Sequence, residues 1–299
     1  IEDLKVQEPN ADELTELYKE LEFNSWLQEV PQKKPVQSAI DSSYKCISTK
    51  DDLEKLIKNA SQAKTLALDT ETTGLDYMDS DLVGISMCFT PGEAFYIPIN
   101  HKDDSSPQLG IDYVLEELRP LLEDSMQKII GQNIKFDMNI LSQHGINISS
   151  IKNDTMMMSY VLDASATRHN LDALSSYYLG YKTSTFEDVA GKGVKQVTFD
   201  EVSIADATHY AAEDADITLR LYEELLSKLE SVESLKKLNE DIEIPLIEVL
   251  SEMEQNGAVL NSKILNAQSK DLENRIKKIE KKAYVLAGDE FNLGSTKQL

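Results

Sequence analysis

The chain has 299 residues, of which 41% are hydrophobic and 28% are charged. This length and composition are typical of a folded protein of about two domains, and they exclude a wholly disordered chain. The formal net charge of −23 argues against a protein that coats nucleic acid by charge alone, because phosphate binding usually needs a Lys and Arg surface.

The predicted elements begin with a helix over 11–29, followed by a proline-containing linker over 30–43. A strand is predicted at 44–48 and a helix at 48–60, with Ser48 as the N-cap of that helix. Three more strands are predicted at 65–69, 81–89 and 93–99, and the short turn between the last two indicates an antiparallel meander.

The second half of the chain is predicted to be mostly helical. After a helix at 112–124 and a strand at 128–132, the pattern predicts helices at 135–145, 154–163, 170–179, 203–230, 239–256 and 262–287. Ser203 and Asp206 resemble a capping box at the start of the long helix, and Gly288 is expected to end the last one. That last helix carries an apolar seam like that of a coiled coil, which predicts a partner helix.

These elements predict an α/β domain over 43–232, preceded by an N-terminal helix and linker at 1–42. Residues 233–299 are predicted to begin a second, helical domain that the chain does not complete. Residues 1–42 hold 10 acidic and 4 basic residues, and residues 263–299 hold 5 acidic and 8 basic residues, so residues 43–262 carry a net charge of −20. Such an excess of carboxylates is either solvated surface or a set of ligands for divalent metal.

The cysteines and the lack of apolar segments both bear on the compartment of the protein. Cys46 and Cys88 have no CxxC partner, which excludes a zinc ribbon and a multiple-disulfide scaffold but leaves a single disulfide open. No apolar run reaches the roughly 18–20 residues that span a bilayer, and the acidic N-terminus has no apolar core of a secretion signal. The sequence therefore predicts a cytoplasmic protein with no membrane partner.

Three acidic segments stand at the ends or starts of predicted elements. The strand at 65–69 runs into Asp69-Thr70-Glu71, and side chains at i and i+2 of a strand share a face. Asp137 lies in the first turn of a later helix, and Asp214 lies four residues after Tyr210 in the long helix. Taken singly, each segment is equally well a solvated strand end, a residue favoured by the helix dipole, or an acidic helix surface.

Taken together, the segments indicate a metal site. Like charges held close together are unfavourable without a cation, and Mg²⁺ or Mn²⁺ prefers oxygen ligands. Four carboxylates from three elements can hold two divalent cations about 4 Å apart, which is an arrangement that cleaves phosphodiesters. The residues that form this set are Asp69, Glu71, Asp137 and Asp214.

The segments DTETTGLD (69–76), GQNIKFD (131–137) and YAAEDAD (210–216) resemble the three motifs of the DEDD 3′–5′ exonucleases. With DTMMMSYVL, RHNLDAL, TFEDVAGKG and EFNLGSTKQL, nearly the whole chain resembles the proofreading part of bacterial family A DNA polymerases. The resemblance implies a ribonuclease-H-like mixed sheet flanked by helices, with the start of a polymerase domain at 233–299. The later carboxylate motifs of the polymerase site are absent from this sequence, so polymerisation is not expected of it.

The resemblance also implies roles for single residues. Asp69, Glu71 and Asp214 resemble the ligands of one metal ion, and Asp69 and Asp137 those of a second. Tyr210 would orient the attacking water. Contacts with the DNA strand are implied for Leu75, Phe186, Gln132, Asn133 and Arg168. The implied partners are a single-stranded DNA 3′ end and, through the basic tract at 275–282, duplex DNA; the expected setting is a monomer in a bacterial cytoplasm, at the nucleoid.

Three alternatives concern the site, its substrate and its activity. His209 and Tyr210 both satisfy a spacing to Asp214 used within the DEDD group, and the helical angle favours Tyr210, which lies about 40° from Asp214. The three motifs also fit an RNA-trimming exonuclease, against which the C-terminal segment argues. A non-catalytic protein that only binds DNA ends is the third possibility, and the complete set of four carboxylates speaks against it.

Overall fold

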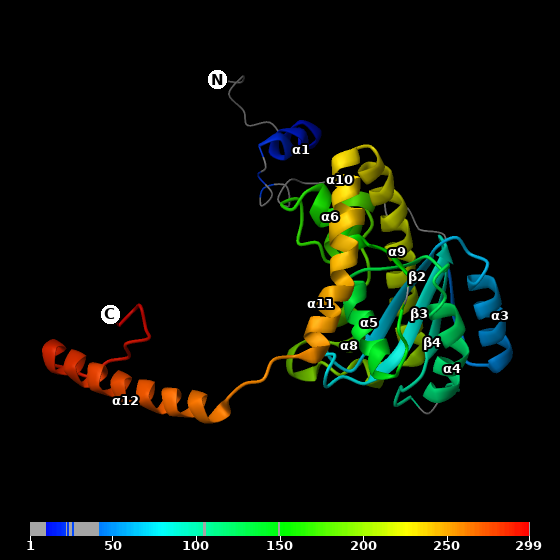
Figure 1. Ribbon diagram of the computed structural model, residues 1–299. Helices are drawn as coiled ribbons and strands as arrows, with labels where there is room; N and C mark the ends of the chain where they lie inside the picture. Colours follow the sequence, from blue (N-terminus) through cyan, green and yellow to red (C-terminus); the bar gives the residue numbers. More distant parts are fainter. Residues whose placement is uncertain are drawn as a thin grey trace, which may run out of the picture. The chain divides into compact units, whose positions relative to one another are not determined.

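The computed structural model describes residues 10–21, 23, 26, 42–103, 106–148 and 150–298. Its centre is a mixed six-stranded sheet with the strand order β1-β4-β3-β2-β5-β6, covered by helices (Figure 1). The strands are β1 (Ser43–Cys46), β2 (Leu66–Thr72), β3 (Leu82–Thr90), β4 (Glu93–Pro98), β5 (Ile129–Gly131) and β6 (Ile151–Asp154).

The helices follow in chain order around this sheet. The longer ones are α1 (Ala11–Glu20), α3 (Lys50–Ala60), α4 (Ile111–Leu122), α5 (Ile134–Gln143), α6 (Thr155–Leu162), α9 (Ile204–Glu230), α11 (Ile244–Asn256) and α12 (Ser262–Ala287). The shorter ones are α7 (Leu171–Leu174), α8 (Phe186–Ala190), α10 (Glu233–Leu238), the π-helical turns Ser175–Leu179 and Asn239–Glu243, and the 3₁₀ turns Gly193–Lys195 and Phe199–Glu201.

The pairing of the strands confirms the predicted meander. β2, β3 and β4 are antiparallel neighbours, with Asp69 opposite Ser86 and Glu71 opposite Gly84. β1 joins β4 in parallel, and β5 and β6 extend the other edge in parallel to β2. Parallel strands need a crossover connection, and the helical segments between β4 and β6 supply it.

Each face of the sheet is buried under a different set of helices. On one face, Leu68, Ile85 and Ile97 join a core with side chains of α3, α4 and α5. On the other face α9 crosses β1 to β5, and its alanines and leucines form a second core with Ala67 and Ile130. Burial on both faces explains why the strands read as continuous apolar runs and why α9 has small residues where it meets the sheet.

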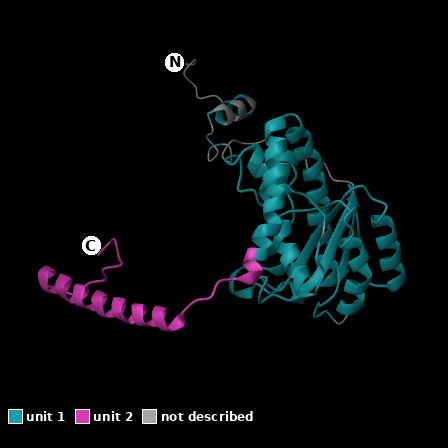
Figure 2. Ribbon diagram, viewed as in Figure 1, with its two compact units in different colours: residues 1–252 teal, residues 253–299 magenta. Residues whose placement is uncertain are grey.

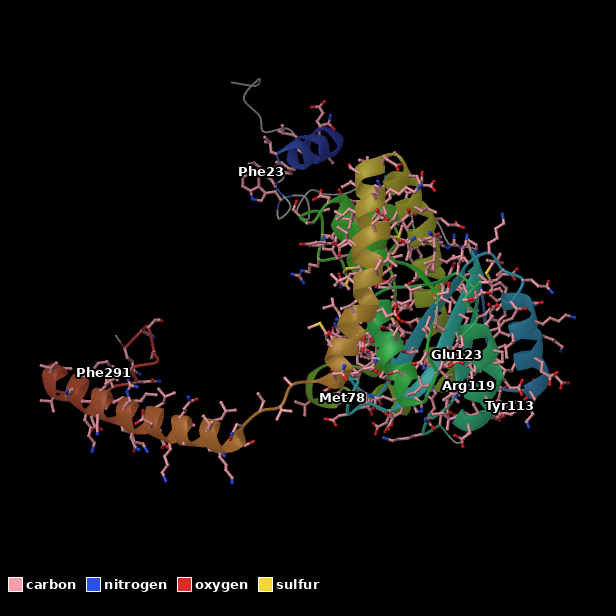
Figure 3. The ribbon with its side chains drawn as sticks, viewed as in Figure 1. Phe23, Met78, Tyr113, Arg119, Glu123 and Phe291 are labelled. Carbon is pink, nitrogen blue, oxygen red and sulfur yellow. The ribbon has the colours of Figure 1, made fainter. Side chains whose placement is uncertain are left out.

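Several predicted elements differ from the observed ones at their ends. The N-cap of α3 is Thr49, whose side chain accepts a hydrogen bond from the backbone N–H of Asp52, so the prediction of Ser48 was wrong by one residue. The helix predicted over 11–29 ends at Glu20, and the ring of Tyr18, in its last turn, packs with the rings of Phe23 and Trp26 that follow (Phe23 is labelled in Figure 3). Most of the linker predicted at 30–43 lies outside the described residues.

Among the elements that were not predicted, β6 and α8 lack an apolar periodicity. β6 has the sequence IKND, and α8 is a single five-residue turn that a capping box of Thr185 and Asp188 begins. By contrast, α9 begins after Ser203, which accepts from the N–H of Asp206 as predicted, and α12 has the predicted bounds with Gly288 in a left-handed C-cap.

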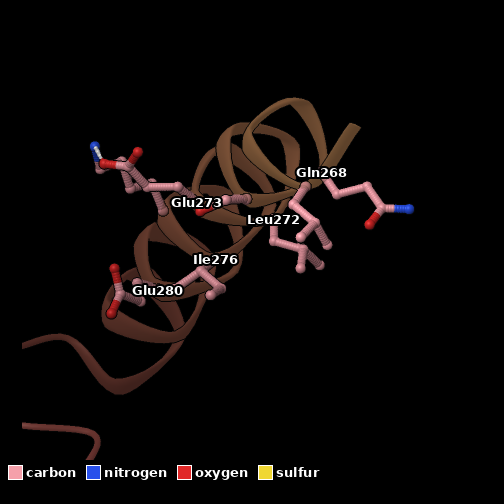
Figure 4. Close-up of a pocket in the computed structure, with 8 residues that line it drawn as sticks. Gln268, Leu272, Glu273, Ile276 and Glu280 are labelled. Atoms are coloured by element: carbon pink, nitrogen blue, oxygen red, sulfur yellow. Dashed lines mark hydrogen bonds and ion pairs between the residues drawn. The ribbon is translucent and has the colours of Figure 1, made fainter. Parts of the chain in front are cut away.

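The chain divides into two compact units, residues 1–252 and 253–299 (Figure 2). The first unit extends beyond the predicted boundary at 232 because α10 packs on α9, Ile247 joins the core, and Ser251 donates to Asn139 of α5. In the second unit most side chains of α12 are exposed, and Leu272 and Ile276 form an apolar strip along it (Figure 4). Among the described helices, none combines the length and apolar character needed to cross a membrane.

Candidate metal-dependent exonuclease site

Two carboxylates of β2 point toward α9. Asp69 and Glu71 alternate with Leu68 and Thr70, which face the opposite core. Opposite Asp69, the Ser86 hydroxyl of β3 donates to its Oδ2 over 3.4 Å. Opposite Glu71 stands Gly84, above which the ring of Tyr96 lies so close that a Cβ at Gly84 would be 2.1 Å from the Tyr96 hydroxyl. The sheet therefore presents Asp69 and Glu71 side by side on one face.

Asp137 reaches the same strand from α5. It is buried in the first turn of that helix, and its Oδ1 accepts hydrogen bonds from the Thr70 backbone N–H at 2.8 Å and the Thr70 hydroxyl at 2.6 Å. Thr70 lies between Asp69 and Glu71 in the sequence, so these two bonds fix Asp137 next to the two carboxylates of β2.

α9 contributes the remaining pair from above the sheet. Tyr210 and Asp214 lie one turn apart, and both are partly buried where α9 crosses β2 and β3. The Tyr210 hydroxyl lowers the pKa of the Asp214 carboxyl, so the two side chains face each other along the helix. The five residues that the sequence analysis placed in the site thus come from three elements that the fold holds against one another.

The electrostatics of the site show how close the carboxylates are. Burial raises the pKa of Asp69 to about 6, and the hydrogen bond from Ser86 opposes that rise. Burial and then the negative charge of Asp69 raise the pKa of Asp137, against the two bonds from Thr70. For Glu71, burial raises the pKa, and the charges of Asp69, Asp214 and Asp137 raise it further.

The α9 pair experiences the same field. Burial raises the pKa of Asp214, followed by the charges of Asp69 and Glu213, whereas the nearby Tyr210 hydroxyl lowers it. The pKa of the Tyr210 hydroxyl is raised by burial and by the charges of Asp214 and Glu71, so the phenol stays protonated and acts as a donor. Partly buried groups of one sign that destabilise one another are a feature of functional sites.

His209 lies elsewhere. Its side chain is exposed, and its ring packs edge-on against Tyr44 of β1 with centroids 5.5 Å apart. In the structure it is therefore Tyr210, and not His209, that adjoins the carboxylates.

The other acidic residues of this α9 segment have structural partners. Buried Glu213 accepts from the Tyr181 hydroxyl and the Ser184 N–H, each at 2.6 Å. Buried Asp216 accepts from the Tyr44 hydroxyl, the Gly92 N–H and Arg220 at 2.8–3.0 Å. For these two residues the interpretation as an acidic surface is wrong, because both are buried and bonded.

The residues expected to contact a DNA strand border the site to different extents. Leu75 is 96% exposed in the turn after β2, and the Phe186 ring is 37% exposed and stacks on Phe199. Arg168 is exposed, next to His169 in the sequence.

Gln132 and Asn133 lie in the turn between β5 and α5. The Gln132 amide donates to the carbonyl of His169 over 2.8 Å, and Thr155 donates to its Oε1 over 2.6 Å. Asn133 has a left-handed backbone with φ of 62°, a conformation that Asn tolerates better than most residues. The turn and the segment at 168–169 are therefore joined by hydrogen bonds.

Sequence reasoning missed three residues that build the site. Thr70 binds Asp137, and its position between two carboxylates on an alternating strand was a usable signal. Asp154 accepts from the N–H groups of Asn133 and Ile134 and from Met156 and Met157, so it joins the N-termini of α5 and α6 (distances 2.8–3.2 Å). Phe199 lies between Phe186 and Tyr210, and nothing in the local pattern indicated it.

The donor chemistry of the four carboxylates fits a divalent cation. Their oxygens are the ligands that Mg²⁺ and Mn²⁺ prefer, and bound positive charge would remove the mutual repulsion that raises their pKa values. In the conformation of the described residues, no three His, Cys, Asp or Glu side chains are arranged to hold a metal ion.

Comparison with known proteins identifies relatives over the whole chain. A family model described as 3′–5′ exonuclease, of the DNA polymerase A type, matches residues 44–230. DNA polymerase I of Pseudomonas aeruginosa is 42% identical and covers 100% of this chain, which spans 34% of that protein. The chain thus corresponds to about a third of the relative's length.

Solved structures confirm the predicted ribonuclease-H-like fold. The POL domain of Pol1 from M. smegmatis, in complex with DNA primer-template and dNTP, aligns with a TM-score of 0.66 at 19% identity, over 85% of this chain and 39% of that one. NrnC of Brucella melitensis with bound Mg²⁺ aligns with a TM-score of 0.51 at 24% identity, over 67% of this chain and 89% of that one.

Proposed function

The chain belongs to the 3′–5′ exonuclease family of DNA polymerase I enzymes, and from this premise we propose that it removes nucleoside monophosphates from single-stranded or frayed 3′ ends of DNA. The observation that carries the proposal is the convergence of four carboxylates from β2, α5 and α9, in which the charge of Asp69 raises the pKa of each of the other three. Such a concentration of negative charge around one spot repels a phosphodiester unless cations neutralise it first.

Two divalent cations, Mg²⁺ or Mn²⁺, complete this proposal. Asp69, Glu71 and Asp214 would hold one ion, and Asp69 and Asp137 the other. When bound, such ions supply a water molecule of lowered pKa and stabilise the charge on the leaving oxygen. The Mg²⁺ in the B. melitensis neighbour supports a divalent metal in this fold.

The protein's own groups would position the reactants. The protonated Tyr210 hydroxyl donates and, with Glu71, would orient the attacking water and the terminal 3′-hydroxyl. Leu75 and the exposed part of Phe186 would wedge and stack the last bases, while Gln132, Asn133 and Arg168 would contact the strand. Cleavage is proposed to be direct hydrolysis without a covalent intermediate.

The segment after the exonuclease domain is proposed to begin a polymerase domain, at 233–299. Its basic tract on α12 (Arg275, Lys277, Lys278, Lys281, Lys282) would lie along duplex phosphates, and the chain would act as a monomer in a bacterial cytoplasm. The P. aeruginosa relative supports this assignment, because its alignment with the chain also covers residues 233–299.

A labelled oligonucleotide tests the activity. A single-stranded DNA carrying a 5′ label, incubated with Mg²⁺, should shorten stepwise from its 3′ end, and EDTA should abolish the shortening. Asp69→Ala should eliminate cleavage without unfolding the protein, whereas Asp79→Asn, an exposed substitution in the turn after β2, should leave the rate unchanged. Full activity of Asp69→Ala would refute the assignment of the site.

The same assay separates the rival functions. Matched DNA and RNA oligonucleotides should be cleaved at different rates, with DNA preferred; preference for RNA would make the protein an RNA-trimming exonuclease. Salt-dependent binding of the oligonucleotide without turnover, in Mn²⁺ as well as Mg²⁺, would instead identify a protein that only binds DNA ends.

A further inference from the structure

Phe199 is the centre of an aromatic cluster beside the site. It is 1% exposed and belongs to the 3₁₀ turn Phe199–Glu201 that precedes α9. Its ring stacks on Phe186 with centroids 6.4 Å apart and planes at 23°, and it contacts the Tyr210 ring at 5.8 Å. Phe199 therefore fills the space between the proposed base-stacking residue and the proposed water-orienting residue.

The turn that carries Phe199 is fastened to the loop after β4. The Lys102 N–H donates to the Asp200 carbonyl over 2.7 Å, and the Lys102 ammonium pairs with the Asp200 and Glu201 carboxylates at 2.9 and 3.0 Å. These contacts join residues about a hundred positions apart in the sequence, so they hold the turn against the sheet and not merely within its own segment.

His101 supports the Phe199 ring from the sheet side. Its ring centroid lies 5.7 Å from that of Phe199. Since the Val202 carbonyl can only accept, the His101 Nδ1 donates to it over 3.1 Å, and Nε2 accepts from the buried Tyr96 hydroxyl over 2.7 Å. The position of Phe199 is thus fixed by hydrogen bonds on both sides of it and by β4 below.

We infer that Phe199 is a positioning residue of the proposed exonuclease, which sets the separation between the Phe186 ring and the Tyr210 hydroxyl. This inference rests on the proposed function. A terminal base stacked on Phe186 would place its phosphodiester at a fixed distance from Phe186, and the rigid Phe199 ring would hold Tyr210 at the matching distance. A flexible aliphatic side chain in its place fills less volume and does not transmit that spacing.

The test compares Phe199→Leu with Phe95→Leu. Phe95 is the neighbour of Tyr96 on β4 but faces the opposite core, where it stacks on Phe89. Both variants should lose thermal stability, as followed by circular dichroism. Phe199→Leu alone should lower kcat on single-stranded DNA, by roughly tenfold to a hundredfold, because misplacement of a positioned group is costly. Equal losses in both variants, in proportion to the unfolded fraction, would overturn the inference.

Double-variant cycles separate positioning from general damage. In a Tyr210→Phe background, Phe199→Leu should lower kcat by less than about threefold, because its effect acts through Tyr210. With an oligonucleotide whose 3′-terminal residue is abasic, the difference in kcat between wild type and Phe199→Leu should disappear, because no base stacks on Phe186. Independent, multiplicative effects in both comparisons would show that Phe199 only stabilises the fold.

The proposed function and this inference fail in different ways. A wild-type protein that never shortens the oligonucleotide refutes the proposed function. Binding of the same oligonucleotide in EDTA, measured by fluorescence anisotropy, tests the cluster without any turnover. Phe186→Ala and Phe199→Leu should each weaken binding severalfold, and the double variant should bind no more weakly than Phe186→Ala; additive losses would refute the link between the two rings.

Discussion

At the scale of single residues, strand alternation decides what belongs to the site. Asp69 and Glu71 face α9, while Thr70 between them faces α5 and binds Asp137. The shared face of Asp69 and Glu71 followed from the period of two along a strand. The contact of Thr70 with Asp137 did not, because an alternating pattern says nothing about which helix covers which face.

Tyr210 and His209 give the sharpest prediction at this scale. Tyr210→Phe should lower the rate of DNA cleavage by about tenfold to a hundredfold, because the hydroxyl that adjoins Asp214 is lost while the ring packing on Phe199 is kept. His209→Gln should leave the rate within about twofold of wild type, since His209 is exposed and packs on Tyr44. Initial rates on a labelled oligonucleotide measure both, and the reverse order would assign the water-orienting role to His209.

A second prediction concerns the close approach of Tyr96 to β3. Gly84→Ala would put a Cβ 2.1 Å from the Tyr96 hydroxyl, in a strand whose backbone cannot move without shifting its partner Glu71. We expect the free energy of unfolding in urea to fall by about 1–3 kcal/mol. Gly110→Ala, at an N-cap with open space around it, should cost less than about 1 kcal/mol. Equal small losses would mean that Tyr96 rotates away freely.

At the scale of elements, the predictions that held best rested on signals local in the sequence. The bounds of α12 and the cap of α9 followed from periodicity, Gly288 and Ser203, which are all local in the sequence. β6 escaped because its four residues IKND have one apolar side chain, and its strand conformation comes from parallel pairing with β5. The order of the six strands likewise depends on contacts far apart in the chain, which no window of sequence reveals.

Asp154, at the end of β6, shows what the missed strand does. Its Oδ2 accepts from the Ile134 N–H at 2.8 Å, and its Oδ1 accepts from the Met156 N–H at 2.8 Å, so one carboxylate caps both α5 and α6. Asp154→Asn removes one of the two accepting oxygens and leaves buried N–H groups unpaired. We expect a loss of about 1–3 kcal/mol in the free energy of unfolding, together with slower cleavage because α5 carries Asp137.

The same substitution at the other end of α6 is the control for that experiment. Asp163 is exposed and accepts from the N–H and hydroxyl of Ser165. Asp163→Asn should change the free energy of unfolding by less than about 1 kcal/mol and leave cleavage unchanged. Urea titrations of the two variants measure these free energies. Equal changes in Asp154→Asn and Asp163→Asn would show that the capping of α5 and α6 by Asp154 does not stabilise the fold.

At the scale of the whole molecule, two groups of carboxylates stand out within the net charge of −20 over residues 43–262. Part of it is structural, since buried Glu213 and Asp216 are satisfied by hydrogen bonds and Arg220. Part is gathered around Asp69, where burial and repulsion raise the pKa values of the other carboxylates. Composition alone indicated an excess of carboxylates, but only the fold separates those that stabilise it from those that oppose it.

The cost of burying these carboxylates in their charged form predicts how the free energy of unfolding depends on pH and on metal. The folded pKa of Asp69, about 6, lies above its ordinary value of 3.8, so the folded state binds the proton more tightly than the unfolded state. The charged carboxylate therefore destabilises the fold fully above about pH 6, and the penalty vanishes as pH falls toward 4.

In EDTA, Asp69→Asn should accordingly be more stable than wild type at pH 7.5, by about 1–3 kcal/mol, and this advantage should shrink at pH 5. Mg²⁺ at pH 7.5 should stabilise wild type and stabilise Asp69→Asn much less, because a cation offsets the cost of burying the charged Asp69 carboxylate. Urea unfolding at the two pH values, with Asp79→Asn as the exposed control, measures all of these differences. An advantage that grows toward pH 5, or equal stabilisation of both proteins by Mg²⁺, would contradict a metal held by Asp69.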